Sequence, residues 1–73
     1  MKLDKNSLRD DALANLYRAA LYLAQDDQET GLDFLKKAQE VLGSDLKTPD
    51  TSLPHLILAE KVLDQYHLLK ANL

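Results

Sequence analysis

Residues 11–42, DALANLYRAALYLAQDDQETGLDFLKKAQEVL, decide the fold of this 73-residue chain. On both sides of the polar QDDQ stretch at 25–28, apolar side chains recur at the three- and four-residue spacing of one helix face. Two such helices joined by so short a connection pack antiparallel as a helical hairpin. Neither can bury its apolar face alone, so the pattern predicts that the hairpin packs against a further helix.

The first helix is predicted over residues 8–24. Ser7 is the expected N-cap, because its hydroxyl can accept an amide hydrogen bond from the first turn. The apolar stripe that follows the helical period comprises Leu13, Leu16, Tyr17, Ala20, Leu23 and Ala24.

The second helix is predicted over residues 27–42. Asp26 and Glu29 have the spacing of a capping box, and Gly43 can adopt the backbone conformation that ends a helix. Gly31 is expected to let the first helix approach closely. The stripe comprises Gly31, Phe34, Leu35, Ala38, Val41 and Leu42.

The third helix is predicted over residues 53–71, after the polar break at 44–52. Thr51 or Ser52 is the expected cap, and Pro54 is tolerated because amides of the first turn have no helical partner. Leu46, in the break, is expected to tuck under the helices. The stripe comprises Leu56, Ala59, Val62, Leu63, Tyr66 and Leu69. The chain is therefore predicted to be all-α, a three-helix antiparallel bundle (helices 8–24, 27–42 and 53–71) that forms a single domain, 1–73.

Composition narrows the function classes. The formal charge is −3, and Lys36-Lys37 is the only adjacent basic pair, so nucleic-acid binding is disfavoured. There is no cysteine to form a disulfide or a thiolate metal site. The N-terminus has no apolar signal region, and the longest apolar run, 19–24, is far short of the roughly 18 residues of a membrane span. We expect a cytoplasmic protein.

No catalytic constellation is visible. Ser7, Ser44 and Ser52 stand at predicted helix ends or in the loop, and no glycine-rich phosphate loop is present. The acids cluster at helix starts, where the helix dipole and capping account for them. We therefore expect neither enzyme activity nor a cofactor.

The two histidines have non-catalytic interpretations. Glu60, Asp64 and His67 share one face of the third helix at i, i+4 and i+7, a spacing that could hold a metal ion. That face is the solvent side of the predicted helix, so a solvated surface is preferred and no metal site is predicted. His55 is expected at the rim of the core, bonded to a carbonyl group.

Some apolar side chains exceed what a minimal bundle requires. The third helix carries a second apolar row, and the first helix adds two residues outside its stripe; together they are Leu53, Ile57, Leu68, Ala71, Leu21 and Tyr22. Either the third helix is more deeply buried than its stripe suggests, or the loop and the N-terminus cover it, or these residues form an interface with another protein or with a second copy of the chain.

The order of segments resembles that of bacteriocin immunity proteins of lactic acid bacteria, which are small cytosolic helical bundles. The resemblance covers residues 13–58: a first helix rich in Leu and Ala, Gly31-Leu32-Asp33 leading to Lys37-Ala38, a polar break, and the run 53–58, LPHLIL. It implies self-protection by binding a membrane-associated receptor complex, often a sugar permease, from the cytosolic side. Members usually have a fourth helix and a C-terminal specificity tail that residues 1–73 do not supply, so the resemblance assigns no functional residue.

A second interpretation rests on the hairpin from Tyr17 to Leu42. It looks like the helical hairpins of MIT domains and tetratricopeptide units, which are adaptors that hold a partner helix or tail in a groove. The alternative prediction is a regulatory or adaptor module.

Overall fold

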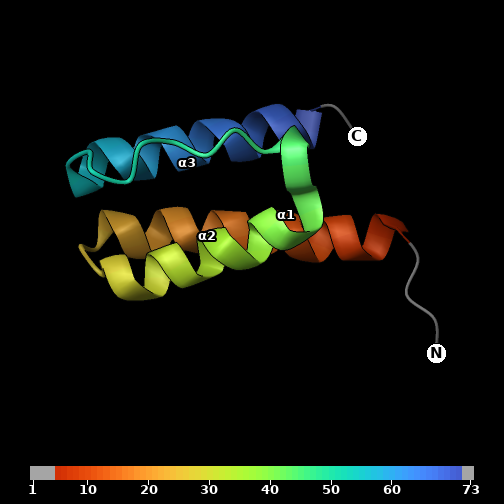
Figure 1. The fold of residues 1–73 in the computed structure, drawn as a ribbon, viewed down its shortest axis with the longest axis horizontal. Helices are drawn as coiled ribbons and strands as arrows, with labels where there is room; N and C mark the ends of the chain where they lie inside the picture. Colours follow the sequence, from red (N-terminus) through yellow and green to blue (C-terminus); the bar gives the residue numbers. More distant parts are fainter. Residues whose placement is uncertain (1–4, 72–73) are drawn as a thin grey trace.

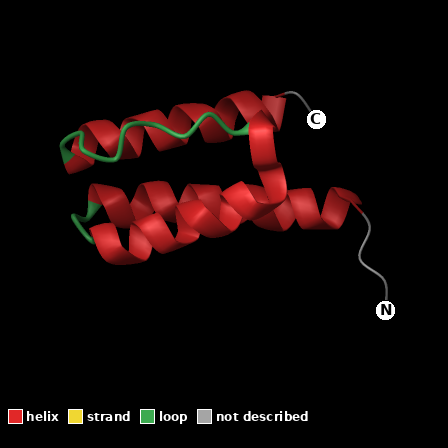
Figure 2. Cartoon of the chain, in the orientation of Figure 1, coloured by secondary structure: helices red, strands yellow, loops and turns green. Residues whose placement is uncertain are grey.

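The computed structural model describes residues 5–71 and contains three α-helices in that range: α1 (Lys5–Ala24), α2 (Gln28–Leu42) and α3 (His55–Ala71). A short 3₁₀ helix, η1 (Gly43–Asp45), follows α2 directly, and residues 5–71 contain no strand (Figure 1, Figure 2). The predicted all-α three-helix bundle is confirmed. Residues 1–4, on which the expectation of no signal peptide partly rests, lie outside the described residues.

Helix α1 is the central element of the bundle. It packs against both α2 and α3, whereas α2 and α3 contact each other far less. Each runs antiparallel to α1, so α2 and α3 point in the same direction (Figure 1). Because α1 is covered from two sides, its buried surface is wider than a single stripe: Ala12, Leu13, Leu16, Ala19, Ala20 and Leu23.

The parallel arrangement of α2 and α3 requires a connection that returns along the whole bundle. Residues 46–54 run back alongside α3 (Figure 1). Residues 47–50 have no regular structure, and residues 50–53 then form a turn in which the Leu53 amide donates to the Asp50 carbonyl at 3.2 Å. The Lys47 amide donates to Gln65 Oε1 on α3 at 3.1 Å, and the Gln39 side-chain amide on α2 donates to the Thr48 hydroxyl.

The described core is entirely aliphatic. Leu16, Leu23, Leu58 and Val62 are its largest fully buried side chains, and no polar or charged side chain in the described range is buried. Leu46 is 5% exposed, which confirms that the start of the connection tucks under the helices. With no aromatic ring in its centre, the core depends on close approach of the helix backbones.

Helices α1 and α2 approach closely at Gly31. A Cβ at this position would lie 2.7 Å from Leu23 Cγ and 3.2 Å from the Leu23 amide nitrogen, so only glycine fits without movement. The prediction of close approach is confirmed. Gly43 has a φ of 56°, which is consistent with its predicted role as the residue that ends α2.

The predicted cap of α2 is wrong by one residue. Asp27, not Asp26, precedes the helix, and its carboxylate accepts a hydrogen bond from the Thr30 amide at 3.2 Å. Asp26 instead adopts a φ of 62° in the turn, a conformation that aspartate tolerates better than most residues. The capping box of Asp26 with Glu29 is therefore not formed.

The other two helix starts also differ from prediction. Helix α1 begins at Lys5, so Ser7 lies inside the helix and is not its cap. Helix α3 begins at His55 rather than at residue 53, and the Pro54 carbonyl accepts the first helical bond from the Leu58 amide at 2.9 Å. The helix therefore starts directly after the proline.

Ser52 does not cap α3. Its hydroxyl and its amide both donate to the Asp50 carboxylate, at 2.7 and 3.0 Å. These two bonds lower the pKa of Asp50, the side-chain bond having the larger effect. The serine thus stabilises the turn before the helix.

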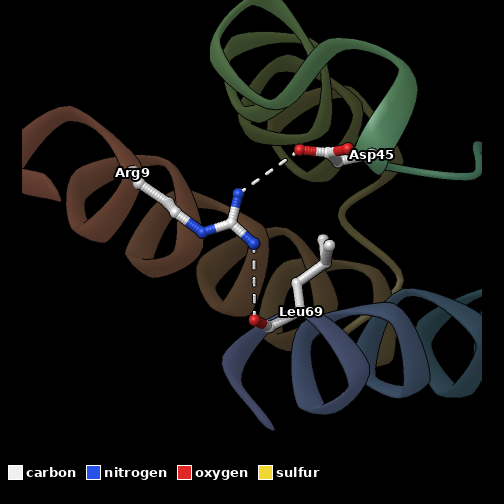
Figure 3. Close-up of polar contacts among 3 residues, drawn as sticks. All are labelled: Arg9, Asp45 and Leu69. Atoms are coloured by element: carbon white, nitrogen blue, oxygen red, sulfur yellow. Dashed lines mark hydrogen bonds and ion pairs between the residues drawn. The ribbon is translucent and has the colours of Figure 1, made fainter. Parts of the chain in front are cut away.

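Arg9 joins three elements at the end of the bundle opposite the α1–α2 turn. Its guanidinium lies between Asp45 of η1 and Leu69 of α3 (Figure 3). Nη1 is 3.5 Å from the Asp45 carboxylate, and Nη2 donates to the Leu69 carbonyl at 3.5 Å. The side chain is only 24% exposed, and it places a positive charge near the C-terminus of α3, which the helix dipole favours. No sequence pattern identified this contact, because its partners are distant along the chain.

Candidate functional site

An apolar groove of about 340 Å³ lies between α1 and α3. We call it the α1–α3 groove and define it by its lining residues, Tyr17, Ala20, Leu21, Ala24, Leu56, Ala59, Glu60 and Leu63. No residue of α2 is among them.

Small and large side chains divide the groove into a floor and walls. Ala20 and Ala59 are buried, at 5% and 7% exposure, and their short side chains leave the hollow between the helices. Leu56 is 59% exposed, Leu21 45% and Tyr17 42%, so the larger residues stand out to solvent. Several large apolar side chains exposed together mark an interaction surface more often than single ones do.

The predicted core stripes are wrong at these positions. Tyr17, Ala24 and Leu56 were assigned to the core but are exposed, as is Val41 on α2. On α3 the buried face is instead centred on Leu58, which belonged to no predicted stripe and is fully buried. The groove therefore consists largely of side chains that the sequence pattern placed inside the bundle.

A hydrogen bond from His55 holds the start of α3 in place beside the groove. The ring of His55, the residue before Leu56, donates from Nδ1 to the Leu23 carbonyl of α1 at 3.1 Å. The prediction that His55 bonds to a carbonyl at the edge of the core is confirmed. This bond ties the start of α3 to the end of α1.

Aromatic rings support the groove near Tyr17. The ring of Tyr17 packs against Tyr66 of α3, with 5.2 Å between centroids and a 48° tilt. The Lys70 ammonium lies 5.5 Å above the Tyr66 ring and donates to its hydroxyl at 3.3 Å. Contacts of this kind hold large rings in a defined position, so Tyr17 presents a fixed face to the groove.

Among the residues that the structure describes, Glu60 is the one charged residue that lines the α1–α3 groove. Its side chain is exposed, and Asp64 follows one helical turn later on the same helix. Within residues 5–71, the side chains that line the groove are therefore apolar apart from the carboxylate of Glu60 and the hydroxyl of Tyr17.

The structure divides the interface residues predicted from the sequence among several places. Leu21 lines the α1–α3 groove. Tyr22 is half-buried and stacks on Phe34 of α2 with 5.5 Å between ring centroids. Leu53 is also half-buried and packs against the core.

The remaining predicted interface residues are exposed on α3 but do not line the groove. Ile57 and Leu68 are 44% and 58% exposed, and charged Lys61 and Asp64 occupy the same helix face between them. Leu68 and Ala71 contribute to a second, more open hollow of about 420 Å³ that Asp64 and His67 also line. Lys61 and Asp64 therefore separate Ile57 from Leu68 along this face of α3.

The described range offers no metal centre. Within residues 5–71, no three His, Cys, Asp or Glu side chains are placed to share an ion, so Glu60, Asp64 and His67 do not form a ligand set. The ring of His67 instead lies edge-on to Tyr66, with 5.4 Å between centroids.

Length and hydropathy of the described helices exclude a membrane-crossing role for any of them. Comparison with protein-family models, with curated proteins and with solved structures finds no match to this chain. The groove itself is therefore the basis for a functional argument.

Proposed function

We propose that this chain is a non-catalytic protein that binds a helix of another protein in the α1–α3 groove. The observation that carries the proposal is the exposure of Leu56, Leu21 and Tyr17 around a floor of buried alanines. Covering this surface would remove apolar area from water, at a gain of about 25 cal/mol per Å².

The shape of the groove favours a helical ligand. Two antiparallel helices border it, so a third helix laid between them can contact both along its length. Recognition of this kind uses apolar anchors at i, i+3 or i+4, and i+7 of the bound helix. The fixed positions of Tyr17 and of the start of α3 reduce the ordering cost of binding.

Bacteriocin self-immunity is the most specific form of this proposal. In that role the chain would act in the cytoplasm and bind a receptor complex at the membrane, as the resemblance of residues 13–58 implies. A regulatory or adaptor module would use the same groove for a partner helix or tail. Genomic neighbours distinguish the two: a gene for a short secreted peptide with a double-glycine leader favours immunity, and a signalling or secretion operon favours an adaptor.

Two matched double variants test the groove. Leu21 and Leu56 line it, whereas Ile57 and Leu68 lie outside it with nearly the same exposure, 45% and 59% against 44% and 58%. Tagged wild-type chain is used to co-purify a partner from the native host, and the partner is identified by mass spectrometry and purified. We expect L21Q/L56Q to lose binding to the purified partner and I57Q/L68Q to retain it.

Circular dichroism of all three proteins serves as the folding control. Retained binding by a folded L21Q/L56Q variant, or its loss only in I57Q/L68Q, would show that the functional surface is elsewhere. Loss of producer self-protection on deletion of the gene, together with recovery of a permease subunit, would support the immunity role.

A further inference from the structure

We infer that the helix bound in the α1–α3 groove carries a lysine or arginine beside its apolar face. This inference rests on the proposed function and adds the chemistry of the partner. Its basis is the position of Glu60, the one charged residue among the described residues that line the groove.

Glu60 is placed to select the charge of a ligand. It lines the apolar groove and is exposed, so a basic side chain flanking a bound apolar face could pair with its carboxylate. Asp64, one turn further along α3, extends the acidic edge. The chain as a whole carries a formal charge of −3, which attracts a basic ligand at longer range.

The nearby cations do not cancel this preference. Lys70 is engaged with the hydroxyl and ring of Tyr66, and Lys61 is not among the groove residues. An acidic helix in the groove would therefore place its charge against Glu60 without a compensating lysine in the lining. Charge opposition of this kind gives specificity, because the wrong partner is repelled.

The same charges disfavour a second copy of the chain as the occupant. A two-fold dimer across the groove would pack this lining against itself, so that both sides of the interface carry Glu60 and neither side's described lining carries a lysine or arginine. Like charges held together at an interface oppose association. A separate protein with a basic flank meets no such opposition.

Two synthetic amphipathic helices test the inference on the full chain. They share one leucine face, and one peptide has lysines beside that face where the other has glutamates. Binding is followed by NMR from the methyl groups of Leu21, Leu56 and Leu63. We expect the lysine peptide to shift these methyls and to bind more tightly than the glutamate peptide.

Variants of Glu60 separate local pairing from net charge. E60Q should weaken binding of the lysine peptide about two- to fivefold, the range expected for one exposed ion pair, and E60K should reduce or reverse the preference between the peptides. E40Q removes one negative charge from the exposed surface of α2, outside the groove, and should have a clearly smaller effect.

Each other outcome overturns the inference. Equal affinity for both peptides, equal effects of E60Q and E40Q, or no shift of the groove methyls would show that Glu60 does not select a basic flank. Methyl shifts that depend on chain concentration without peptide would identify a second copy as the occupant. A different result would contradict the proposed binding groove itself: equal binding of the purified partner to the wild type and to L21Q/L56Q.

Discussion

The Nδ1 atom of His55 lies 3.1 Å from the carbonyl oxygen of Leu23, and because a carbonyl only accepts, the histidine ring is the donor. The same carbonyl also accepts the Asp26 amide at 3.1 Å, so it has two donors at the end of α1. One histidine thus connects the last turn of α1 to the first turn of α3. Both the Nδ1–H tautomer and the charged ring can make this bond.

Replacing His55 with alanine should destabilise the fold. The variant loses the hydrogen bond and leaves the Leu23 carbonyl with one donor fewer, so we expect the free energy of unfolding in urea to fall by about 1 kcal/mol. His67→Ala is the matched control, since His67 is exposed and its described ring contact is with the adjacent Tyr66. Equal losses in the two variants would show that the His55 bond adds nothing to stability.

Arg9 should contribute mainly through α3 rather than through its ion pair. Asp45 is 64% exposed, and an exposed ion pair contributes about 0.2–1 kcal/mol, so Asp45→Asn should have a small effect that salt reduces. Arg9→Met also removes the contact with the Leu69 carbonyl and the favourable charge at the helix end, and should cost about 1 kcal/mol. Urea unfolding at low and high salt measures both. An Asp45→Asn effect as large as that of Arg9→Met would contradict this ranking.

Gly31→Ala should destabilise the protein although alanine is the better helix former. Helix propensity favours alanine by about 1 kcal/mol, but the added Cβ would lie 2.7 Å from Leu23 Cγ, and relief of such overpacking costs about 1–3 kcal/mol. We expect a lower unfolding midpoint. In a double-mutant cycle with Leu23→Ala, the combined loss should be less than the sum of the single losses, because the shortened side chain gives the new methyl room. Additive losses would exclude the clash as the cause.

The turn before α3 should weaken in acid. The hydrogen bonds from Ser52 hold the pKa of Asp50 below its ordinary value of 3.8, so the charged carboxylate is favoured by folding. Its contribution is complete above that ordinary value and is lost as the pH falls through the lowered pKa. A carboxyl NMR titration should show this pKa, and Ser52→Ala should raise it towards 3.8, since the side-chain bond is the larger cause. Ser44→Ala is the control and should leave the Asp50 titration unchanged.

The helical hairpin could be predicted from the sequence because its signals are local. Spacing of apolar residues, the short QDDQ connection and the glycine after Leu42 all act within a few residues, and the resulting helix ranges agree with the structure to within a few positions. The choice between Asp26 and Asp27 as cap depends on the backbone conformation of the turn, which two adjacent aspartates do not specify. Asp26 and Asp27 each carry a carboxylate that can cap a helix, so residue type alone does not decide between them.

The groove could not be predicted because it depends on the direction of α3. A periodic pattern shows which residues share a face but not how wide the buried sector is or which neighbour covers it. Here the 46–54 connection returns alongside α3 and sets it antiparallel to α1 (Figure 1), and the covered face centres on Leu58 rather than on Leu56. The sequence did contain one indication of an exposed apolar surface, because α3 has more large apolar residues than one buried stripe can hold.

Leu58 and Leu56 therefore provide the sharpest test of the fold. Leu58 is fully buried whereas Leu56 is 59% exposed, although the sequence pattern assigned only Leu56 to the core. Leu58→Ala should cost about 2–5 kcal/mol, because it removes buried methyl groups and leaves a cavity. Leu56→Ala should cost under about 1 kcal/mol while weakening capture of a partner helix in the α1–α3 groove. Because Leu56 and Leu58 are two residues apart, they lie on nearly opposite faces of α3, and the same leucine-to-alanine change makes each variant the control for the other. If thermal or urea unfolding ranks Leu56→Ala as the more damaging variant, α3 is rotated from the position described and the groove does not exist in solution.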